Sequence, residues 1–158
     1  MNLRDPRSDD APAMAALLND IIDIGGTTAH TTPVSADYFR TRMASDASQS
    51  AWSAALDDRL LGMQWVNPNS ALPPEACDIS TFVRVGLTGR GIGSALFERT
   101  ADKARALGYR WINAAIRADN IGGLAYYSAR GFKNWGTVKA VTLANGQTVD
   151  KVLKRFDL

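Results

Sequence analysis

The chain has 158 residues, 46% of them hydrophobic and 22% charged, with a formal net charge of +2. This length and composition are ordinary for one soluble globular domain with a buried core. The positive charge is small and scattered, whereas a nucleic-acid-binding protein usually carries a clustered basic face. We therefore expect a single domain over residues 1–158 that does not bind nucleic acid.

The sequence lacks the usual signals for membranes, export and metals. No run approaches the roughly 18 apolar residues that span a bilayer, and Met1–Asp10 lacks the layout of a signal peptide. One cysteine, Cys77, and one histidine, His30, exclude an internal disulfide and make a zinc site improbable. Cys77 is better interpreted as a packed apolar residue than as a nucleophile. We expect a cytoplasmic protein without a metal.

The first half of the chain predicts two helices and then two strands. Capping side chains at Ser8–Asp10 and apolar residues at helical spacing predict a first helix, which Gly25-Gly26 ends. A polar loop, residues 27–35, precedes a second helix. Trp52–Leu56 and Leu60–Val66 are predicted to be strands joined by a compact turn.

The second half adds alternating strands and helices and a final hairpin. Asp78–Val85 is rich in residues that favour strands, and a long helix after a glycine-rich turn ends at Leu107. The remaining predicted elements are a strand at Arg110–Ile116, a helix at Asn120–Arg130 and hairpin strands at Trp135–Leu143 and Gln147–Phe156. This order predicts an α/β (α+β) fold with a mixed sheet.

The glycine-rich turn Val83–Gly93, VRVGLTGRGIG, lies between a predicted strand and a predicted helix. Glycines let the backbone turn tightly and approach a ligand closely. Successive outward N–H groups and the helix N-terminus suit a pyrophosphate. A nucleotide P-loop is excluded because no Gly-Lys-Ser/Thr occurs, and a dinucleotide fingerprint lacks its third glycine. Coenzyme A and a plain strand-to-helix connection remain as interpretations.

This turn resembles the pattern V-x-P-x-x-[RQ]-G-x-G-[IL]-G of the GNAT superfamily of N-acetyltransferases. The matching positions are Val83, Val85, Thr88, Gly89, Arg90, Gly91, Ile92 and Gly93. Val85 replaces the frequent proline, and Thr88 replaces the usual Arg or Gln. A second block, NIGGLAYYSARGF, is similar to the family's N-x₆-Y-x₃-G-F segment, and Asn120, Tyr127 and Gly131-Phe132 are in register.

The resemblance implies a fold and a co-substrate. The fold is a single GNAT domain with a mixed, mostly antiparallel sheet, helices on both faces and a central strand splayed from its neighbour, usually by a bulge. The co-substrate is acetyl-CoA, whose pantetheine arm bonds the backbone of Val83 and Val85, where an N–H also polarises the thioester carbonyl. The implied cofactor-binding residues are Val83, Arg84, Val85, Thr88, Gly89, Arg90, Gly91, Ile92, Gly93, Ser94, Asn120 and Tyr127.

The resemblance also implies a general acid and a general base. Tyr127 is the candidate acid for the leaving thiolate, because tyrosine, with a reference pKa of about 10, keeps its proton at neutral pH. A packed aromatic is the alternative, which fits neighbouring Tyr126 better. Asp78 is the candidate base, since DISTFV resembles the E-S-x-x-V stretch of phosphinothricin acetyltransferase-like members. Asp78 would act through a water, and a capping carboxylate at the strand start is the alternative.

Two residues are weaker candidates for the acceptor site. His30, in the polar loop TTAHTTPVS, could contact an acceptor carboxylate, act as a second base or be solvated. Trp65 could line the acceptor pocket or belong to the core. We expect acetyl transfer to a primary amine of a small molecule, such as an amino acid or its analogue, by direct attack in a ternary complex. Acetylation of a protein N-terminus or lysine, and a non-catalytic acyl-CoA-binding module, are the alternatives. Apolar strands in the C-terminal hairpin predict a homodimer.

Overall fold

A computed structural model describes all 158 residues, which form one seven-stranded sheet with helices on both faces. The strands are β1 (Asn2–Arg4), β2 (Ala51–Leu56), β3 (Leu60–Asn67), β4 (Ala76–Val83), β5 (Trp111–Arg117), β6 (Lys133–Thr142) and β7 (Thr148–Asp157). The helices are α1 (Ala11–Ile24), α2 (Ala36–Ala44), α3 (Ile92–Ala106) and α4 (Ile121–Arg130), and a 3-10 turn at Ser8–Asp10 precedes α1.

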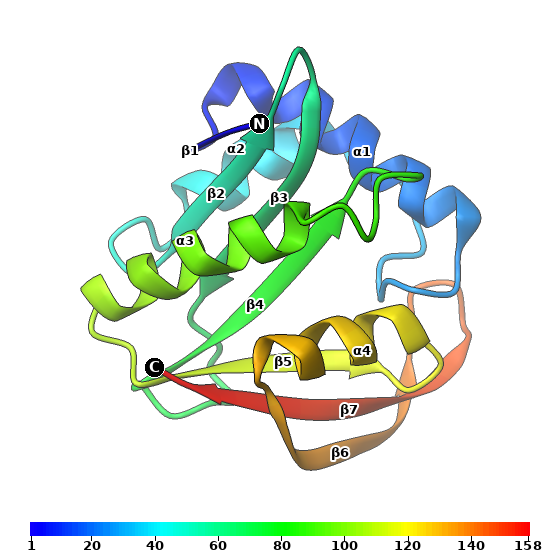
Figure 1. Cartoon of the computed structure of the whole chain (residues 1–158). Helices are drawn as coiled ribbons and strands as arrows, with labels where there is room; N and C mark the ends of the chain where they lie inside the picture. Colours follow the sequence, from blue (N-terminus) through cyan, green and yellow to red (C-terminus); the bar gives the residue numbers. More distant parts are fainter.

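The strand order is β1-β2-β3-β4-β5-β7-β6, and only β4 and β5 pair in parallel. Figure 1 shows α3 and α4 in front of the sheet, with α1 and α2 behind it. The structure therefore confirms the α+β fold and the mixed, mostly antiparallel sheet that the sequence predicts.

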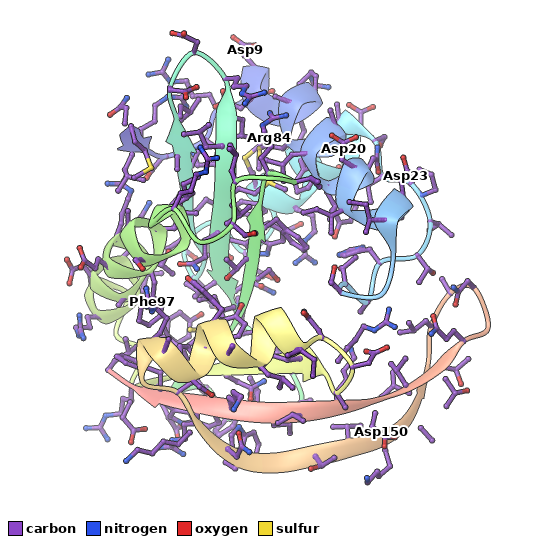
Figure 2. The ribbon with its side chains drawn as sticks, turned by 45° about the vertical axis from the view of Figure 1, so that its right-hand side comes forward. Asp9, Asp20, Asp23, Arg84, Phe97 and Asp150 are labelled. Carbon is purple, nitrogen blue, oxygen red and sulfur yellow. The ribbon has the colours of Figure 1, made fainter.

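The core consists of separate apolar layers, because side chains on a strand alternate between the two faces of a sheet. Met14, Phe39 and Trp65 belong to the layer under α1 and α2. On the other face of the sheet, Phe97 of α3 (Figure 2) packs against Phe132, with ring centroids 5.5 Å apart. The two helix layers thus hold the sheet from both sides.

The sheet splits between β4 and β5. These strands pair only where Ala76–Asp78 lies beside Trp111–Asn113, and then they diverge (Figure 1). The splayed central strand is confirmed, but the expected bulge is not its cause. The pairing of β4 with β3 runs without a register shift from Asp78 to Val83. The separation therefore lies on the β5 side alone.

Most element boundaries lie within about two residues of the predicted ones, as is usual for helix and strand ends. Gly25, with φ of +75°, ends α1 as expected. Two elements differ from the prediction. Strand β1 was not predicted, because three residues carry no periodic pattern and pair with β2 only in the folded chain. Strand β4 ends at Val83, and Val85 stands beyond it with 47% of its surface exposed.

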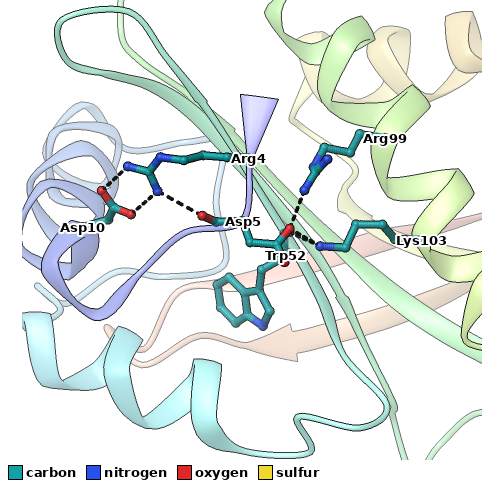
Figure 3. A network of polar contacts seen from close by, with 6 residues as sticks. All are labelled: Arg4, Asp5, Asp10, Trp52, Arg99 and Lys103. Carbon is teal, nitrogen blue, oxygen red and sulfur yellow. Dashed lines mark hydrogen bonds and ion pairs between the residues drawn. The ribbon is translucent and has the colours of Figure 1, made fainter. Parts of the chain in front are cut away.

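Charged side chains fasten the N-terminal segment to the sheet and to α3 (Figure 3). Arg4 forms an ion pair with Asp10 at 2.7 Å. Asp5 accepts hydrogen bonds from both Arg99 and Lys103 of α3. Lys103 also donates to the backbone oxygen of Trp52 in β2, at 2.8 Å. This network lies away from the split in the sheet.

Candidate active site

A cavity of about 1270 Å³ occupies the region where β4 and β5 diverge. Its walls come from β4, the glycine-rich turn, α4, the loop after α1 and the end of β5. The predicted site residues that line it are His30, Asp78, Val83, Val85, Thr88, Gly89, Gly91, Ile92, Gly93, Ser94, Asn120 and Tyr127. One cavity therefore brings together most of the residues that the two sequence blocks single out.

The cavity receives side chains from both faces of the sheet. Phe82 packs with the layer under α1 and α2, so Asp78, an even number of residues away, points to the same side. Thr81 contacts Tyr127 of α4 on the other side. Because no neighbouring strand fills the gap beyond Asp78, groups from the two faces line the same space.

The glycine-rich turn presents an unbroken series of backbone donors. Gly86, Gly89 and Gly91 have φ values of +85°, +78° and +82°, a region that side-chain-bearing residues rarely adopt. None of the seven N–H groups from Thr88 to Ser94 has an acceptor in the protein. These donors stand at the N-terminus of α3, where the helix dipole favours an anion. The donor set therefore fits a pyrophosphate.

Gly93 has a further, structural reason to be glycine. A Cβ atom there would lie 2.6 Å from Cε1 of Tyr126, so only glycine lets α4 approach α3 this closely. The hydroxyl of Tyr126 donates to the backbone oxygen of Gly93 at 2.6 Å. Burial raises the pKa of Tyr126. The alternative interpretation, a packed helix aromatic, thus describes Tyr126 well.

Arg130 adds a cation that the sequence analysis did not single out. Its guanidinium bonds the hydroxyl of Ser94 and lies 5.6 Å from the ring centre of Tyr126. Arg130 also lines the cavity. It belongs to the second sequence block, but at a variable position, so the motif gave no signal for it. A guanidinium beside the turn increases its affinity for anionic groups.

Backbone directions along β4 decide which groups face the cavity. The N–H of Arg84 donates to the oxygen of Leu61 at 2.8 Å, and its Nε donates to the oxygen of Leu60 at 2.7 Å. Arg84 therefore lies against β3 and does not line the cavity, which corrects its predicted place among the cofactor-binding residues (Figure 2). The N–H groups of successive residues along a strand point alternately to opposite sides. Because the N–H of Arg84 points toward β3, the backbone of Val83 faces the gap between β4 and β5.

Tyr127 stands in the wall of the cavity with 7% of its surface exposed. Its hydroxyl lies 2.8 Å from Oγ1 of Thr81. Burial raises the pKa of Tyr127 well above its usual value, and the hydrogen bond with Thr81 only partly opposes this. Tyr127 therefore keeps its proton throughout the neutral range.

Asp78 accepts hydrogen bonds at both carboxylate oxygens, from Nδ2 of Asn69 at 2.6 Å and from Nδ2 of Asn113 at 2.7 Å. Groups that can only donate fix both amides in this orientation. The indole of Trp135 donates to Oδ1 of Asn113, and the N–H of Ala71 donates to Oδ1 of Asn69, each at 2.9 Å. The amide nitrogens must therefore face Asp78, which is held as an acceptor.

His30 lines the cavity on the side of α1 and α2, edge-on to Phe82 with ring centres 6.3 Å apart. Burial, together with the charges of Arg42 and Lys151, lowers the pKa of His30. Its imidazole is therefore neutral at neutral pH and able to accept a proton. Arg42 and Lys151 line the same cavity, and neither forms an ion pair.

A sequence model described as the acetyltransferase (GNAT) family matches residues 15–132, which is most of the chain. The chain belongs to this acetyltransferase family. It is accordingly an N-acetyltransferase with acetyl-CoA as its co-substrate. The seven free N–H groups of the turn are the feature of this chain that fits the pyrophosphate of that co-substrate.

Individual relatives are distant but extend over the whole chain. "Putative phosphinothricin acetyltransferase YwnH" of Bacillus subtilis (strain 168) is 25% identical over 160 residues, which cover 98% of each chain. The crystal structure of ribosomal-protein-alanine N-acetyltransferase from Brucella melitensis has a TM-score of 0.88 at 22% identity, covering 100% of both chains. A GNAT superfamily phosphinothricin acetyltransferase from Sinorhizobium meliloti in complex with AcCoA has a TM-score of 0.87 at 23% identity, covering 99% of this chain and 88% of the other. These structures share the fold.

Trp65 and Asn120, two of the predicted site residues of the acetyltransferase, make contacts within the protein. Trp65 is only 1% exposed, stacks on Trp52 with ring centroids 4.4 Å apart and does not line the cavity. It belongs to the core, which corrects its predicted place in the acceptor pocket. Asn120 lines the cavity but caps α4 by accepting from the N–H of Gly123 at 2.9 Å, and its Nδ2 donates to the oxygen of Thr27 at 3.0 Å. Asn120 thus joins α4 to the polar loop.

The other expectations concern Cys77, metals and membranes. Cys77 is fully buried, and burial raises the pKa of its thiol to about 12, so it is not a nucleophile at neutral pH. No group of three or more His, Cys, Asp or Glu side chains is arranged to hold a metal ion. No helix of the acetyltransferase is both long and apolar enough to cross a membrane.

Proposed function

We propose that this acetyltransferase transfers the acetyl group to the primary amine of a small acidic molecule, such as an amino acid or its analogue. The observation that carries the proposal is a pair of cations, Arg42 and Lys151, that line the cavity near His30 without carboxylate partners. We take this α1 and α2 side of the cavity as the acceptor side. A carboxylate on the acceptor would provide those partners. The Bacillus subtilis relative carries the name of an enzyme for such a molecule.

The proposed roles follow from what each group can donate or accept. Acetyl-CoA supplies the thioester acetyl group, and an acceptor amine attacks it directly within a ternary complex. The N–H groups from Thr88 to Ser94 bind the pyrophosphate, with Asn120 positioning α4 beside them. The backbone of Val83 and Val85 holds the pantetheine arm and polarises the carbonyl. Tyr127 donates its proton to the departing sulfur.

The proton of the amine needs an acceptor on the other side of the cavity. We propose Asp78, acting through a water, because a carboxylate offers about four lone pairs and its two amide partners occupy only two. His30 is the second base, since its lowered pKa leaves it neutral. Asp78→Asn is expected to lose most activity at low pH, where amines are charged, and to recover part of it at high pH. Equal loss across pH 6 to about 9 would assign the base elsewhere.

The decisive experiment is an acceptor panel with thiol release as the measurement. Purified protein and acetyl-CoA are mixed with amino acids, their uncharged amides, amino acid analogues and short peptides. Acidic small amines are expected to react fastest, because they provide a carboxylate for Arg42 and Lys151, which the uncharged amides lack. Preference for peptides would make the enzyme a protein N-terminal or lysine acetyltransferase. Binding of acetyl-CoA without transfer to any amine would leave a non-catalytic acyl-CoA-binding module.

We also propose that residues 1–158 act as one catalytic domain in a cytoplasmic homodimer. The face of β6 and β7 turned away from α4 supports the dimer, because Trp135 and Val138 are 47% and 42% exposed there. Leu143 and Val149 of the same hairpin are buried and do not contribute. Light scattering at micromolar concentration measures the mass, and a monomer contradicts this proposal. The lone thiol Cys77 suits a reducing compartment.

A further inference from the structure

A continuous chain of hydrogen bonds runs through the interior from the start of α3 to Tyr127. Tyr126 bonds the backbone oxygen of Gly93 at 2.6 Å. Nε2 of Gln64 lies 3.1 Å from the hydroxyl of Tyr126 and 2.9 Å from Oγ1 of Thr81. The hydroxyl of Thr81 lies 2.8 Å from that of Tyr127, and either oxygen could be the donor in this last link. The links before it fix the donors at Tyr126 and Gln64.

The direction of the chain is fixed at its beginning. A backbone carbonyl only accepts hydrogen bonds, so Tyr126 must give its single hydroxyl proton to Gly93. The oxygen of Tyr126 can then only accept from Gln64, which must present its amide nitrogen. The fully buried Oε1 of Gln64 consequently has no partner. Gln64 thus donates two hydrogen bonds through its amide nitrogen, while its amide oxygen accepts none.

The same amide nitrogen also donates to Thr81. Thr81 accepts this hydrogen bond from Gln64, and its only other side-chain hydrogen bond within the protein is with Tyr127. A hydroxyl that accepts from Gln64 keeps its own proton to donate, and the arrangement on which our proposal rests has Thr81 give that proton to the oxygen of Tyr127. Tyr127 then does not spend its own proton on Thr81. That proton remains free to point into the cavity, which Tyr127 lines.

We propose that Gln64 and Thr81 are positioning residues, which orient the hydroxyl proton of Tyr127 toward the reacting sulfur. This inference rests on the proposed role of Tyr127 as the general acid. If the last link ran the other way, the proton of Tyr127 would point into the protein wall. The hydroxyl would then have to rotate before each transfer. The chain removes that step by offering Tyr127 a donor instead of an acceptor.

The experiment measures variants of Thr81, Tyr127 and Gln64 and one control, each with the acceptor that reacts fastest in the panel. Thr81→Val removes the hydroxyl but keeps the shape, and Thr81→Ser restores it. Tyr127→Phe and the double variant Thr81→Val/Tyr127→Phe test whether Thr81 acts through Tyr127. Thr100→Val is the matched control, because Thr100 is also buried but its hydroxyl has no partner and lies on α3. Thermal denaturation establishes that every variant is folded.

We expect Thr81→Val to lower kcat about tenfold, the typical effect of one hydrogen bond, without changing KM for acetyl-CoA. Thr81→Ser should regain most of the rate, and Thr100→Val should match the wild type. In the Tyr127→Phe background, Thr81→Val should cause no further loss. Gln64→Glu should also slow kcat, because the replacement carboxylate cannot donate to Thr81.

Two results would overturn the inference in distinguishable ways. A wild-type rate for Thr81→Val beside a slow Tyr127→Phe removes the positioning role and leaves the proposed acid intact. An equal loss from Thr81→Val with and without the Tyr127 hydroxyl has the same meaning, since Thr81 then acts independently. A wild-type rate for Tyr127→Phe overturns the acid role itself, and the positioning role with it.

Discussion

The two faces of the split sheet contribute different kinds of groups to the same cavity. On the side of α3 and α4, the main feature is one continuous stretch of backbone, Thr88–Ser94, with unpaired N–H groups. On the side of α1 and α2, the chemistry comes from separate side chains, namely His30, Arg42, Asp78 and Lys151. The first side depends on local backbone geometry, and the second depends on how distant elements assemble. Changes on each side should therefore have separable effects.

The largest expected effect is the loss of acetyl-CoA binding in Gly91→Val. Gly91 caps α3 with φ of +82°, a conformation that valine adopts only with strain. The turn must then rearrange, and its N–H groups no longer point at one anion. At 100 times the dissociation constant, acetyl-CoA should stabilise the wild type by about 2.7 kcal/mol. Differential scanning calorimetry should show no such shift for the variant.

Gly146→Val is the matched control for backbone strain. Gly146 has a φ of +85°, and its turn joins β6 to β7 away from the glycine-rich turn. Both variants should therefore lose stability, but Gly146→Val should keep the full shift with acetyl-CoA. A full shift in Gly91→Val would mean that the pyrophosphate binds elsewhere.

This difference between the faces also explains what the sequence could predict. The turn is recognisable because its glycines lie close together in the sequence, and the positive φ values of three of them and the free N–H groups are local properties. Arg42 and Lys151 stand on α2 and β7 without any motif, and only the tertiary fold brings them to one cavity. The cations of the acceptor side therefore could not be found from sequence alone.

Strand alternation accounts for two further differences. Arg84 lies inside the motif, but its N–H donates to the backbone oxygen of Leu61 in β3. Its place in the sequence therefore does not bring it to the acetyl-CoA cavity. Trp65 faces the core for the same kind of reason. Gln64 did carry a usable signal, because it is a polar residue within the apolar strand LLGMQWVN. A buried amide in such a strand requires hydrogen-bond partners.

The second largest effect is expected from Tyr127→Phe. The phenyl ring keeps the packing against Phe132, whose ring centre is 5.0 Å away, so stability should barely change. Removal of a general acid lowers the rate by a factor of about 10² to 10⁴, and we expect the lower end because water can partly replace it. KM for acetyl-CoA should be unchanged. Unlike Asp78→Asn, this variant should not recover at high pH, which stopped-flow thiol release can measure.

Arg42→Gln and Lys151→Gln should act on the acceptor side alone. Loss of one hydrogen bond to a charged group is expected to raise KM for acidic acceptors about tenfold or more. KM for acetyl-CoA and the rate with uncharged amides should stay constant. Lys139→Gln is the control, since Lys139 is an exposed cation paired with Asp150 on the neighbouring strand. A raised KM for acetyl-CoA in the Arg42 or Lys151 variant would show that the two sides are not separable.

The smallest effect is expected from Asp5→Asn, which touches neither side of the cavity (Figure 3). Partial burial acts to raise the pKa of Asp5, but hydrogen bonds from Lys103 and Arg99 hold that pKa below its usual value. A carboxyl with a lowered pKa stabilises the fold above its unfolded pKa and loses this contribution as the pH falls through the folded pKa. Asp5 therefore contributes fully at pH 7 and progressively less below about pH 4.

Because the Asp5 side chain is 64% exposed, its ion pairs should contribute no more than about 1 kcal/mol to the free energy of unfolding. Urea denaturation of wild type and Asp5→Asn should differ by that amount at pH 7 and converge as the pH falls through the lowered pKa of Asp5. Added salt should also reduce the difference. Activity and both KM values should remain those of the wild type. If Asp5→Asn instead changed KM for acetyl-CoA, the N-terminal network would control the position of α3, and the glycine-rich turn would not depend on local backbone geometry alone.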